Sequence, residues 1–175
     1  MSLIGAECTG KSTLATDIGI HLSGFVVPEV LRAFVAEHGR TPTSTEQAAI
    51  AHSQRSAELH ALARHPWVVA DPAPLMTAVY SQVYFHDDGL VEETLAWLRD
   101  SRLIVWCRPD FPWVADPGQR DGPGARSAVD HALASHVARL RARGADVIEA
   151  CGTPAHRLAA VHAALTATTG PRDLD

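Results

Sequence analysis

The chain has 175 residues, of which 46% are hydrophobic and 20% are charged, which suffices for one ordinary globular domain with a sizeable core. Its net charge of -5 argues against a general nucleic-acid binder, which needs a basic face for phosphate contacts. Three widely separated cysteines without a C-x-x-C pair predict reduced thiols, and apolar runs of a few residues predict neither a membrane span nor a signal peptide. We expect one cytoplasmic domain over residues 1–175, without a nucleic-acid or membrane partner and with an oligomeric state that the sequence leaves open.

The first predicted element is a short buried strand over residues 1–4, and the pattern G-x-x-x-x-G-K-[ST] follows it directly. This pattern is typical of a phosphate-binding loop, in which two glycines allow a tight turn and backbone N–H groups point at the phosphates of a nucleotide. Lys11 would add a positive charge on the β- and γ-phosphates of ATP, and the Ser12 hydroxyl would bind the Mg²⁺ that bridges them. The predicted ATP-binding residues of this loop are Gly5, Glu7, Cys8, Thr9, Gly10, Lys11, Ser12 and Thr13.

A second strand is predicted over residues 24–27 and a helix over 29–37, which places Glu29 at the start of that helix. Phosphoryl transfer needs a carboxylate that orients or deprotonates the attacking hydroxyl, and we assign this role to Glu29. Arg32, one helical step further, would pair with Glu29 or contact the substrate. The alternative is that Glu29 is a solvent-exposed glutamate in the first turn of a helix. Thr43 and Glu46 form a capping box, which predicts a long helix to about residue 64.

The third predicted strand, residues 67–70, is a run of four apolar residues that ends at Asp71. A buried parallel strand places its last carboxylate at the carboxyl edge of the sheet, so Asp71 is expected to hold Mg²⁺ together with Ser12. In the alternative interpretation Asp71 only caps the next helix. It also stays open whether the two acids exchange roles, with Asp71 as the base and Glu29 as the Mg²⁺ ligand. Helices are predicted over residues 75–85 and 90–100.

After a fourth strand, residues 103–106, the chain has one long irregular segment over residues 108–126. A segment of this length in a compact domain is usually functional, and we predict a lid over the phosphates. Arg120 and Arg126 would neutralise charge on the transferring phosphoryl group, whereas an ordinary solvated loop is the alternative for either arginine.

The remaining elements are a helix over residues 129–143, a strand over 146–149 and a last helix that opens at Gly152, Thr153 and Pro154. Five strands that alternate with helices predict an α/β fold, a P-loop NTPase three-layer α/β/α sandwich with a five-stranded parallel sheet. Ligands of such a sheet bind beyond the carboxyl ends of its strands, where all the candidate residues fall. Gly152 and Thr153 complete the predicted ATP site.

Five segments of the sequence resemble the bacterial nicotinamide riboside kinase domain. The residues that carry the resemblance are G-A-E-C-T-G-K-S-T-L-A at 5–15, V-P-E-V-L-R-A-F at 27–34, the stretch from 71 to 81, D-F-P-W-V-A-D-P-G-Q-R at 110–120 and the loop at 152–158. The likeness therefore covers nearly the whole chain.

The resemblance implies a kinase that uses ATP and Mg²⁺ to phosphorylate the 5′-hydroxyl of a pyridine nucleoside, which gives the mononucleotide for NAD synthesis. The residues expected to contact the nucleoside are Glu29, Arg32, Tyr84, Trp113 and Asp116. Pro28 stands where the family carries an aromatic residue, so either Trp113, Tyr84 or Phe85 stacks on the base or the substrate is a different nucleoside. Multidomain relatives also carry an adenylyltransferase domain and a DNA-binding segment, for which 175 residues leave no room.

Two other functions use the same residues. The first is a kinase for a deoxynucleoside, a nucleoside monophosphate or another small hydroxylated metabolite. The second is a regulatory P-loop ATPase whose hydrolysis switches a partner without any small acceptor. Trp113 and Arg120 of the predicted lid favour an enclosed acceptor over a switch that faces a protein.

Overall fold

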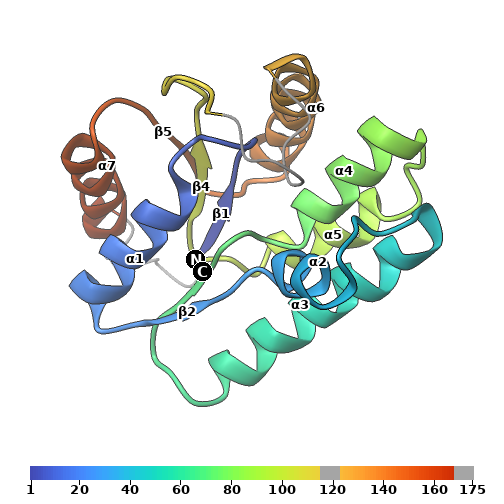
Figure 1. Cartoon of the computed structure of the whole chain (residues 1–175). Coiled ribbons are helices and arrows are strands. Elements are labelled where there is room, and N and C mark those ends of the chain that lie inside the picture. The colour runs from blue at the N-terminus through green and yellow to red at the C-terminus, as the bar shows by residue number, and fades with distance from the viewer. Residues whose placement is uncertain (115–122, 168–175) are drawn as a thin grey trace.

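The computed structural model describes residues 1–114 and 123–167, and its centre is a five-stranded sheet in the order β2-β3-β1-β4-β5 (Figure 1). All four strand pairs are parallel. The strands are β1 (Ser2–Ile4), β2 (Phe25–Val27), β3 (Val68–Ala70), β4 (Ile104–Cys107) and β5 (Val147–Ala150). This is the sheet predicted from the sequence, and the α/β P-loop fold class is confirmed.

Helices cover both faces of the sheet and form the outer two layers (Figure 1). Helices α1 and α7 contact each other on one side, whereas α4 contacts α5 and α6 on the other. The helices are α1 (Lys11–Leu22), α2 (Val30–His38), the short 3₁₀ helix η1 (Ser44–Glu46), α3 (Gln47–Leu62), α4 (Leu75–Phe85), α5 (Val91–Leu98), α6 (Pro123–Ala142) and α7 (Pro154–Ala167). Helix α3 packs against β2, β3 and α4, and α2 lies on α3.

Successive residues of the central strands face opposite layers, because side chains alternate along a strand. Leu3 of β1 and Val105 of β4 belong to the core beneath α1 and α7. Their neighbours Ile4 and Ile104 belong to the core beneath α4, α5 and α6. Both faces are therefore apolar, which explains why these strands are continuous hydrophobic runs in the sequence.

Two helices begin several residues away from their predicted starts, whereas the ends of the other helices differ from the prediction by one or two residues. Helix α6 begins at Pro123, so its first turns occupy the end of the segment predicted as an irregular lid. Proline is well tolerated at the first position of a helix, where its missing N–H is not needed, and its fixed φ suits the helix. The predicted capping box is present, since Thr43 and Glu46 bond reciprocally, but it opens η1 and α3 begins only at Gln47. Within the described residues, none of the helices combines the length and hydrophobicity that a membrane span requires.

The sheet order brings the two predicted phosphate-site segments together. Strand β1 lies between β3 and β4, and Ser2 pairs with Ala70. The loop after β1 starts at Gly5 and the chain after β3 starts at Asp71, so both leave the same carboxyl edge of the sheet side by side.

Candidate active site

The loop between β1 and α1 turns so tightly that two of its positions have no room for a side chain. Gly5 has φ of 150°, and a Cβ atom there would lie 2.5 Å from the carbonyl oxygen of Cys107. Gly10 caps α1 with φ of 73°, and a Cβ atom there would lie 2.9 Å from the ring of Phe111. Cys8 also has a left-handed backbone, with φ of 52°. Left-handed residues at these positions curl the loop around a concave surface lined by N–H groups, which suits phosphate oxygens.

The side chain of Lys11 folds back over this loop. Its Nζ atom donates hydrogen bonds to the carbonyl oxygens of Gly5 and Ala6, both at 2.7 Å. Thr9 donates from its hydroxyl to the same Ala6 carbonyl at 2.8 Å. An anionic phosphate is a stronger partner for an ammonium group than two neutral carbonyls. The loop therefore holds Lys11 ready to exchange these contacts for a phosphate.

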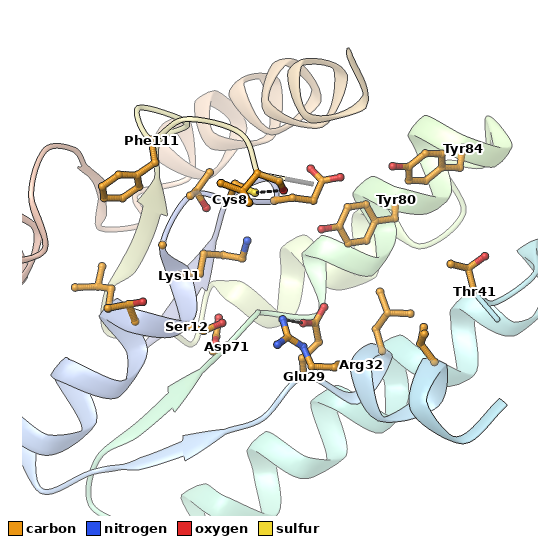
Figure 2. A pocket seen from close by; sticks show the side chains of 18 of the residues that line it. Cys8, Lys11, Ser12, Glu29, Arg32, Thr41, Asp71, Tyr80, Tyr84 and Phe111 are labelled. Carbon is orange, nitrogen blue, oxygen red and sulfur yellow. Dashed lines mark hydrogen bonds and ion pairs between the residues drawn. The ribbon is translucent and has the colours of Figure 1, made fainter. Parts of the chain in front are cut away.

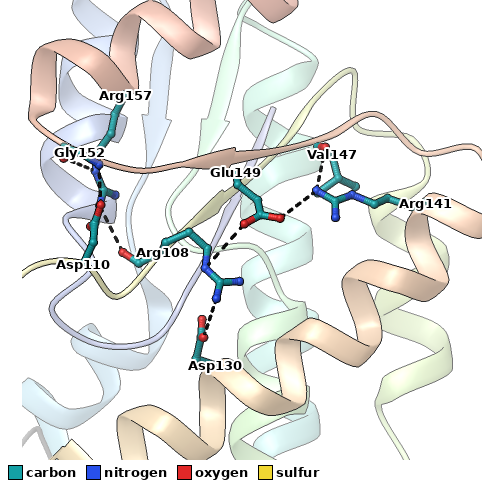
Figure 3. Close-up of polar contacts among 8 residues, drawn as sticks. All are labelled: Arg108, Asp110, Asp130, Arg141, Val147, Glu149, Gly152 and Arg157. Atoms are coloured by element: carbon teal, nitrogen blue, oxygen red, sulfur yellow. Dashed lines mark hydrogen bonds and ion pairs between the residues drawn. The ribbon is translucent and has the colours of Figure 1, made fainter.

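Arg157, in the first turn of α7, points toward Asp110 and Gly152 (Figure 3) and also bonds to the phosphate-binding loop. Its side chain is 1% exposed and donates to the carbonyl oxygens of Thr9 at 2.7 Å, Gly152 at 3.0 Å and Arg108 at 3.2 Å. It also forms a salt bridge with Asp110, whose second oxygen accepts from the Gly152 N–H. One buried guanidinium thus joins the phosphate-binding loop, the end of β4 and the loop before α7.

A cavity of about 920 Å³ opens over the phosphate-binding loop (Figure 2). Figure 2 shows Phe111 and Tyr84 toward opposite ends of it, with Lys11 between them. The volume is at the upper end of the usual range for ligand pockets and leaves room for two small molecules. The residues that line it are Glu7, Cys8, Thr9, Gly10, Lys11, Ser12, Thr13, Leu14, Glu29, Leu31, Arg32, Val35, Thr41, Pro42, Gln47, Asp71, Tyr80, Tyr84, Phe85, Phe111, Val114, Pro154 and Arg157.

Glu29 is the residue just before α2, and it lines this cavity. The segment is held by Gln54 of α3, which accepts from the Val30 N–H at 2.8 Å and donates to the Pro28 carbonyl at 3.3 Å. Burial raises the pKa of the Glu29 carboxyl, and the positive charges of Lys11 and Arg32 oppose this only in part. Arg32 lies 3.4 Å from the Glu29 carboxylate. A carboxyl group with a raised pKa, next to a phosphate-binding loop, suits a general base.

Asp71 and Ser12 supply oxygen atoms on the phosphate side of the same cavity. Asp71 is 8% exposed and Ser12 is exposed at the start of α1. A carboxylate and a hydroxyl are the hard donors that Mg²⁺ prefers, and Mg²⁺ usually takes only one or two protein ligands beside phosphate and water. No group of three or more His, Cys, Asp or Glu side chains forms a metal site in the described ranges. The pair therefore fits a Mg²⁺ that arrives with the nucleotide.

The far half of the cavity has the character of a site for a small organic molecule. Tyr80 and Tyr84 of α4 point into it, with ring centroids 6.1 Å apart (Figure 2). Gln47 is 4% exposed and adds an amide group to the lining. Phe85, Leu31 and Val35 provide apolar surface. Aromatic walls with a few polar groups are typical of sites that bind a planar ring.

Most of the residues predicted from the sequence meet in this cavity. Those that line it are Glu7, Cys8, Thr9, Gly10, Lys11, Ser12, Thr13, Glu29, Arg32, Asp71 and Tyr84. Gly5, Trp113, Arg126, Gly152 and Thr153 are not among the lining residues of the described chain. Arg126 is buried in α6 and donates to the Phe111 carbonyl at 2.8 Å. Asp116 and Arg120 lie outside the described residues, so their predicted roles stay predictions.

Sequence reasoning did not single out Arg157, Tyr80, Gln47 or Phe111 as site residues. Tyr80 could have been found as the residue one helical turn before Tyr84. Arg157 gives no local signal, because its partners lie up to 148 positions away. Pro28 is exposed and does not line the cavity, whereas Tyr84 and Phe85, two of the residues suggested for stacking, do.

Comparison with known proteins gives a family and a fold. The sequence matches the AAA domain family over residues 1–157. No curated protein sequence is significantly similar to the chain.

Several solved structures share the fold, among them the following three. The NadR protein in complex with NAD and AMP-PNP is 18% identical, with a TM-score of 0.72 over 99% of this chain. The chain spans about half, 51%, of the NadR chain. Deoxyadenosine kinase from M. mycoides, with dCMP and dCDP bound, is 11% identical, with a TM-score of 0.66 over 95% of this chain and 98% of the kinase. The same kinase with dATP is 12% identical, with a TM-score of 0.64 over 94% and 97% of the two chains.

Proposed function

This chain belongs to the AAA domain family, and from that premise we propose that it is an ATP-dependent kinase that phosphorylates the 5′-hydroxyl of a nucleoside. One observation carries the proposal. A single cavity joins the phosphate-binding loop at Lys11 to a half-buried carboxylate, Glu29, and to an aromatic chamber beyond it. This arrangement suits phosphoryl transfer, which needs the acceptor oxygen in line with the γ-phosphorus and the leaving oxygen, and a base within reach of the acceptor hydroxyl.

The described cations of the cavity favour an acceptor without a phosphate group. Within the described chain these cations are Lys11, Arg32 and Arg157. Lys11 belongs to the ATP site, Arg32 is paired with Glu29, and Arg157 is buried and bonded to backbone carbonyls. Among the described residues, a second phosphate in the acceptor half would therefore lack a cation of its own. A nucleoside fits this chamber better than a nucleoside monophosphate.

Among nucleosides, we propose nicotinamide riboside, which would become nicotinamide mononucleotide. The fold shared with NadR and the sequence likeness to the riboside kinase domain support this choice. The chamber is also chemically suited to a pyridinium ring, which is planar and positively charged. Tyr80 and Tyr84 offer aromatic faces, and the acidic side chains Glu7 and Glu29 lie in the same cavity.

The placement of these residues supports the following roles in the proposed reaction. The backbone N–H groups of the loop and Lys11 hold the β- and γ-phosphates of ATP and neutralise charge that develops on them. Ser12 and Asp71 would hold Mg²⁺, which neutralises phosphate charge when it is bound. Glu29 accepts the proton of the 5′-hydroxyl as its oxygen attacks the γ-phosphorus. The bond between the γ-phosphorus and the β,γ-bridging oxygen breaks, and ADP leaves with that oxygen.

The direct test is ADP formation from ATP and Mg²⁺ with a panel of nucleosides headed by nicotinamide riboside. Lys11→Ala is the blank, because it removes the charge on the phosphates. We expect nicotinamide riboside to stimulate ADP formation at least about tenfold over the rate without nucleoside. Slow hydrolysis that no nucleoside changes would contradict the proposal and favour a regulatory ATPase.

A deoxynucleoside is the second candidate acceptor. The fold likeness to deoxyadenosine kinase extends over nearly the full length of both chains, whereas the chain spans half of NadR. In addition, Pro28 stands at the position where the riboside kinases carry an aromatic residue. Deoxyadenosine and deoxycytidine therefore belong in the panel, and preference for either over nicotinamide riboside would decide for this candidate.

A further inference from the structure

Glu7 is an acidic residue inside the phosphate-binding loop, where it has no evident use for ATP. The loop binds phosphates with backbone N–H groups and Lys11, and a carboxylate repels phosphate oxygens. Glu7 nevertheless lines the cavity. Its Oε2 atom is buried and has no hydrogen-bond partner among the described residues. A buried carboxylate oxygen without a donor is costly, so this arrangement indicates that a ligand supplies the donor.

Tyr80 of α4 is a second polar group that lines the same cavity. Its hydroxyl points into the cavity (Figure 2), and no hydrogen bond of this hydroxyl is found within the described part of the chain. Burial raises the pKa of Tyr80 well above its ordinary value, and the negative charges of Glu7 and then Glu29 raise it further. The phenol therefore stays protonated and can donate one hydrogen bond while it accepts another.

We propose that Glu7 and Tyr80 together bind the ribose hydroxyl groups of the acceptor nucleoside. The 5′-hydroxyl must lie between Lys11 and Glu29, so the sugar attached to it passes the wall that Glu7 and Tyr80 form. The base then extends toward Tyr84. A vicinal diol presents two O–H donors, which the carboxylate accepts, and an oxygen to which the phenol donates. The inference rests on the proposed nucleoside kinase and assigns Glu7 to the acceptor instead of to ATP.

This subsite makes the enzyme selective for ribonucleosides over deoxynucleosides. When a site built to bind a hydroxyl receives an analogue without it, its buried polar groups stay unpaired, and discrimination is strong. A carboxylate that only attracted a cationic base would give no such discrimination. Discrimination against deoxynucleosides therefore separates two roles for the Glu7 carboxylate, binding of the ribose hydroxyl groups and attraction of a cationic base.

The test compares nicotinamide riboside with its 2′-deoxy and 3′-deoxy counterparts as substrates of the wild type, Glu7→Gln and Tyr80→Phe. For the wild type we expect kcat/KM to fall at least about tenfold when either hydroxyl is missing. In Glu7→Gln, kcat/KM for the riboside falls by about the same factor, the ratio between riboside and deoxyriboside approaches one, and the KM for ATP stays within about twofold. Tyr80→Phe gives the same pattern more weakly. Glu37→Gln, an exposed acid on α2, is the matched control and keeps the wild-type ratio.

Two results would overturn the inference while the wild type still phosphorylates nucleosides. One is a riboside-to-deoxyriboside ratio that Glu7→Gln leaves unchanged. The other is a rise in the KM for ATP with no change for the nucleoside, which would return Glu7 to the ATP site. If Glu7→Gln does not fold, the ratio in Tyr80→Phe decides. A wild type that no nucleoside stimulates overturns the proposed function itself, and the wild-type measurement alone identifies that case.

Discussion

Arg157 of α7 donates a hydrogen bond of 2.7 Å to the carbonyl oxygen of Thr9, so α7 holds the phosphate-binding loop, which lies 148 residues earlier in the sequence. The same guanidinium lies 4.5 Å from the centre of the Phe111 ring, which in turn covers Gly10. The loop conformation is therefore set by tertiary contacts as well as by its own glycines.

Replacing Arg157 should impair ATP binding as well as stability. Arg157→Met leaves the carbonyl oxygen of the buried Thr9 without its donor, and an unsatisfied buried acceptor costs about 1–3 kcal/mol. Arg157→Lys keeps the charge but loses the fork of donors, so it should raise the KM for ATP about tenfold and destabilise less. Urea unfolding and ATP kinetics measure both effects. Arg99→Lys on the surface is the control, and an unchanged KM in Arg157→Lys would refute the role in positioning the loop.

Gly10 and Gly124 offer a matched pair of glycine substitutions. Gly10→Ala puts a Cβ atom 2.9 Å from Phe111 at a φ of 73°, which should cost about 1–2 kcal/mol of strain and weaken ATP binding. Gly124 lies in the first turn of α6 with nothing within 4 Å, so Gly124→Ala should stabilise by about 0.5–1 kcal/mol. Thermal unfolding without ATP measures the effect of each substitution on stability, and the shift on adding ATP measures its effect on ATP binding. Equal effects of both substitutions would show that the loop tolerates a side chain.

The rate of the proposed reaction should depend on the ionisation of Glu29. Burial raises the pKa of this carboxyl, so the active, deprotonated form is lost at a higher pH than for an ordinary glutamate. Arg32 lowers the pKa of Glu29, and Arg32→Met should therefore move the acid limb of kcat/KM to still higher pH. Glu29→Gln should reduce kcat by a factor of about 10²–10⁴ and remove the limb. Full activity in Glu29→Gln would exclude the base, and Asp71 would take its place as the candidate.

Glu58 should make the protein less stable at alkaline pH. Burial raises the pKa of Glu58 from 4.5 to about 7, so the folded state binds the proton more tightly than the unfolded state. The contribution to stability is therefore present below pH 4.5 and is lost as the pH rises through about 7. Between about pH 5 and pH 8 the loss amounts to about 2 kcal/mol, and Glu58→Gln should remove it. Urea unfolding at both pH values, with Glu37→Gln as control, tests this, and an equal pH dependence in all three proteins would refute it.

The sequence predicted those parts of the molecule that depend on local pattern. The five strands, their parallel arrangement and the glycine-rich loop after the first strand follow from apolar runs and glycine spacing, and the structure confirms them. Glu29 and Asp71 both line the cavity, because each lies within two residues of the end of a strand that points to the same edge of the sheet. Their catalytic and metal-binding roles stay predictions.

The remaining features depend on contacts between distant residues. Arg157 takes part through partners on three other segments, and no spacing in the sequence reveals them. Arg126 appeared to lie in a loop because prolines and glycines precede it, yet Pro123 starts a helix and Arg126 is buried in that helix. The capping box of Thr43 and Glu46 predicted one continuous helix from residue 43 onward. In the structure it caps the short 3₁₀ helix η1, and Gln47 is the first residue of α3.

The most direct measurement of the central claim is the identity of the phosphorylated product. Phosphorus NMR and mass spectrometry of a reaction with ATP, Mg²⁺ and nicotinamide riboside would show it, with Lys11→Ala beside the wild type. We predict nicotinamide mononucleotide and ADP in equal amounts from the wild type and neither from the variant. Free phosphate and ADP without any nucleoside monophosphate would contradict the account, because the aromatic chamber beyond Glu29 would then hold no phosphoryl acceptor.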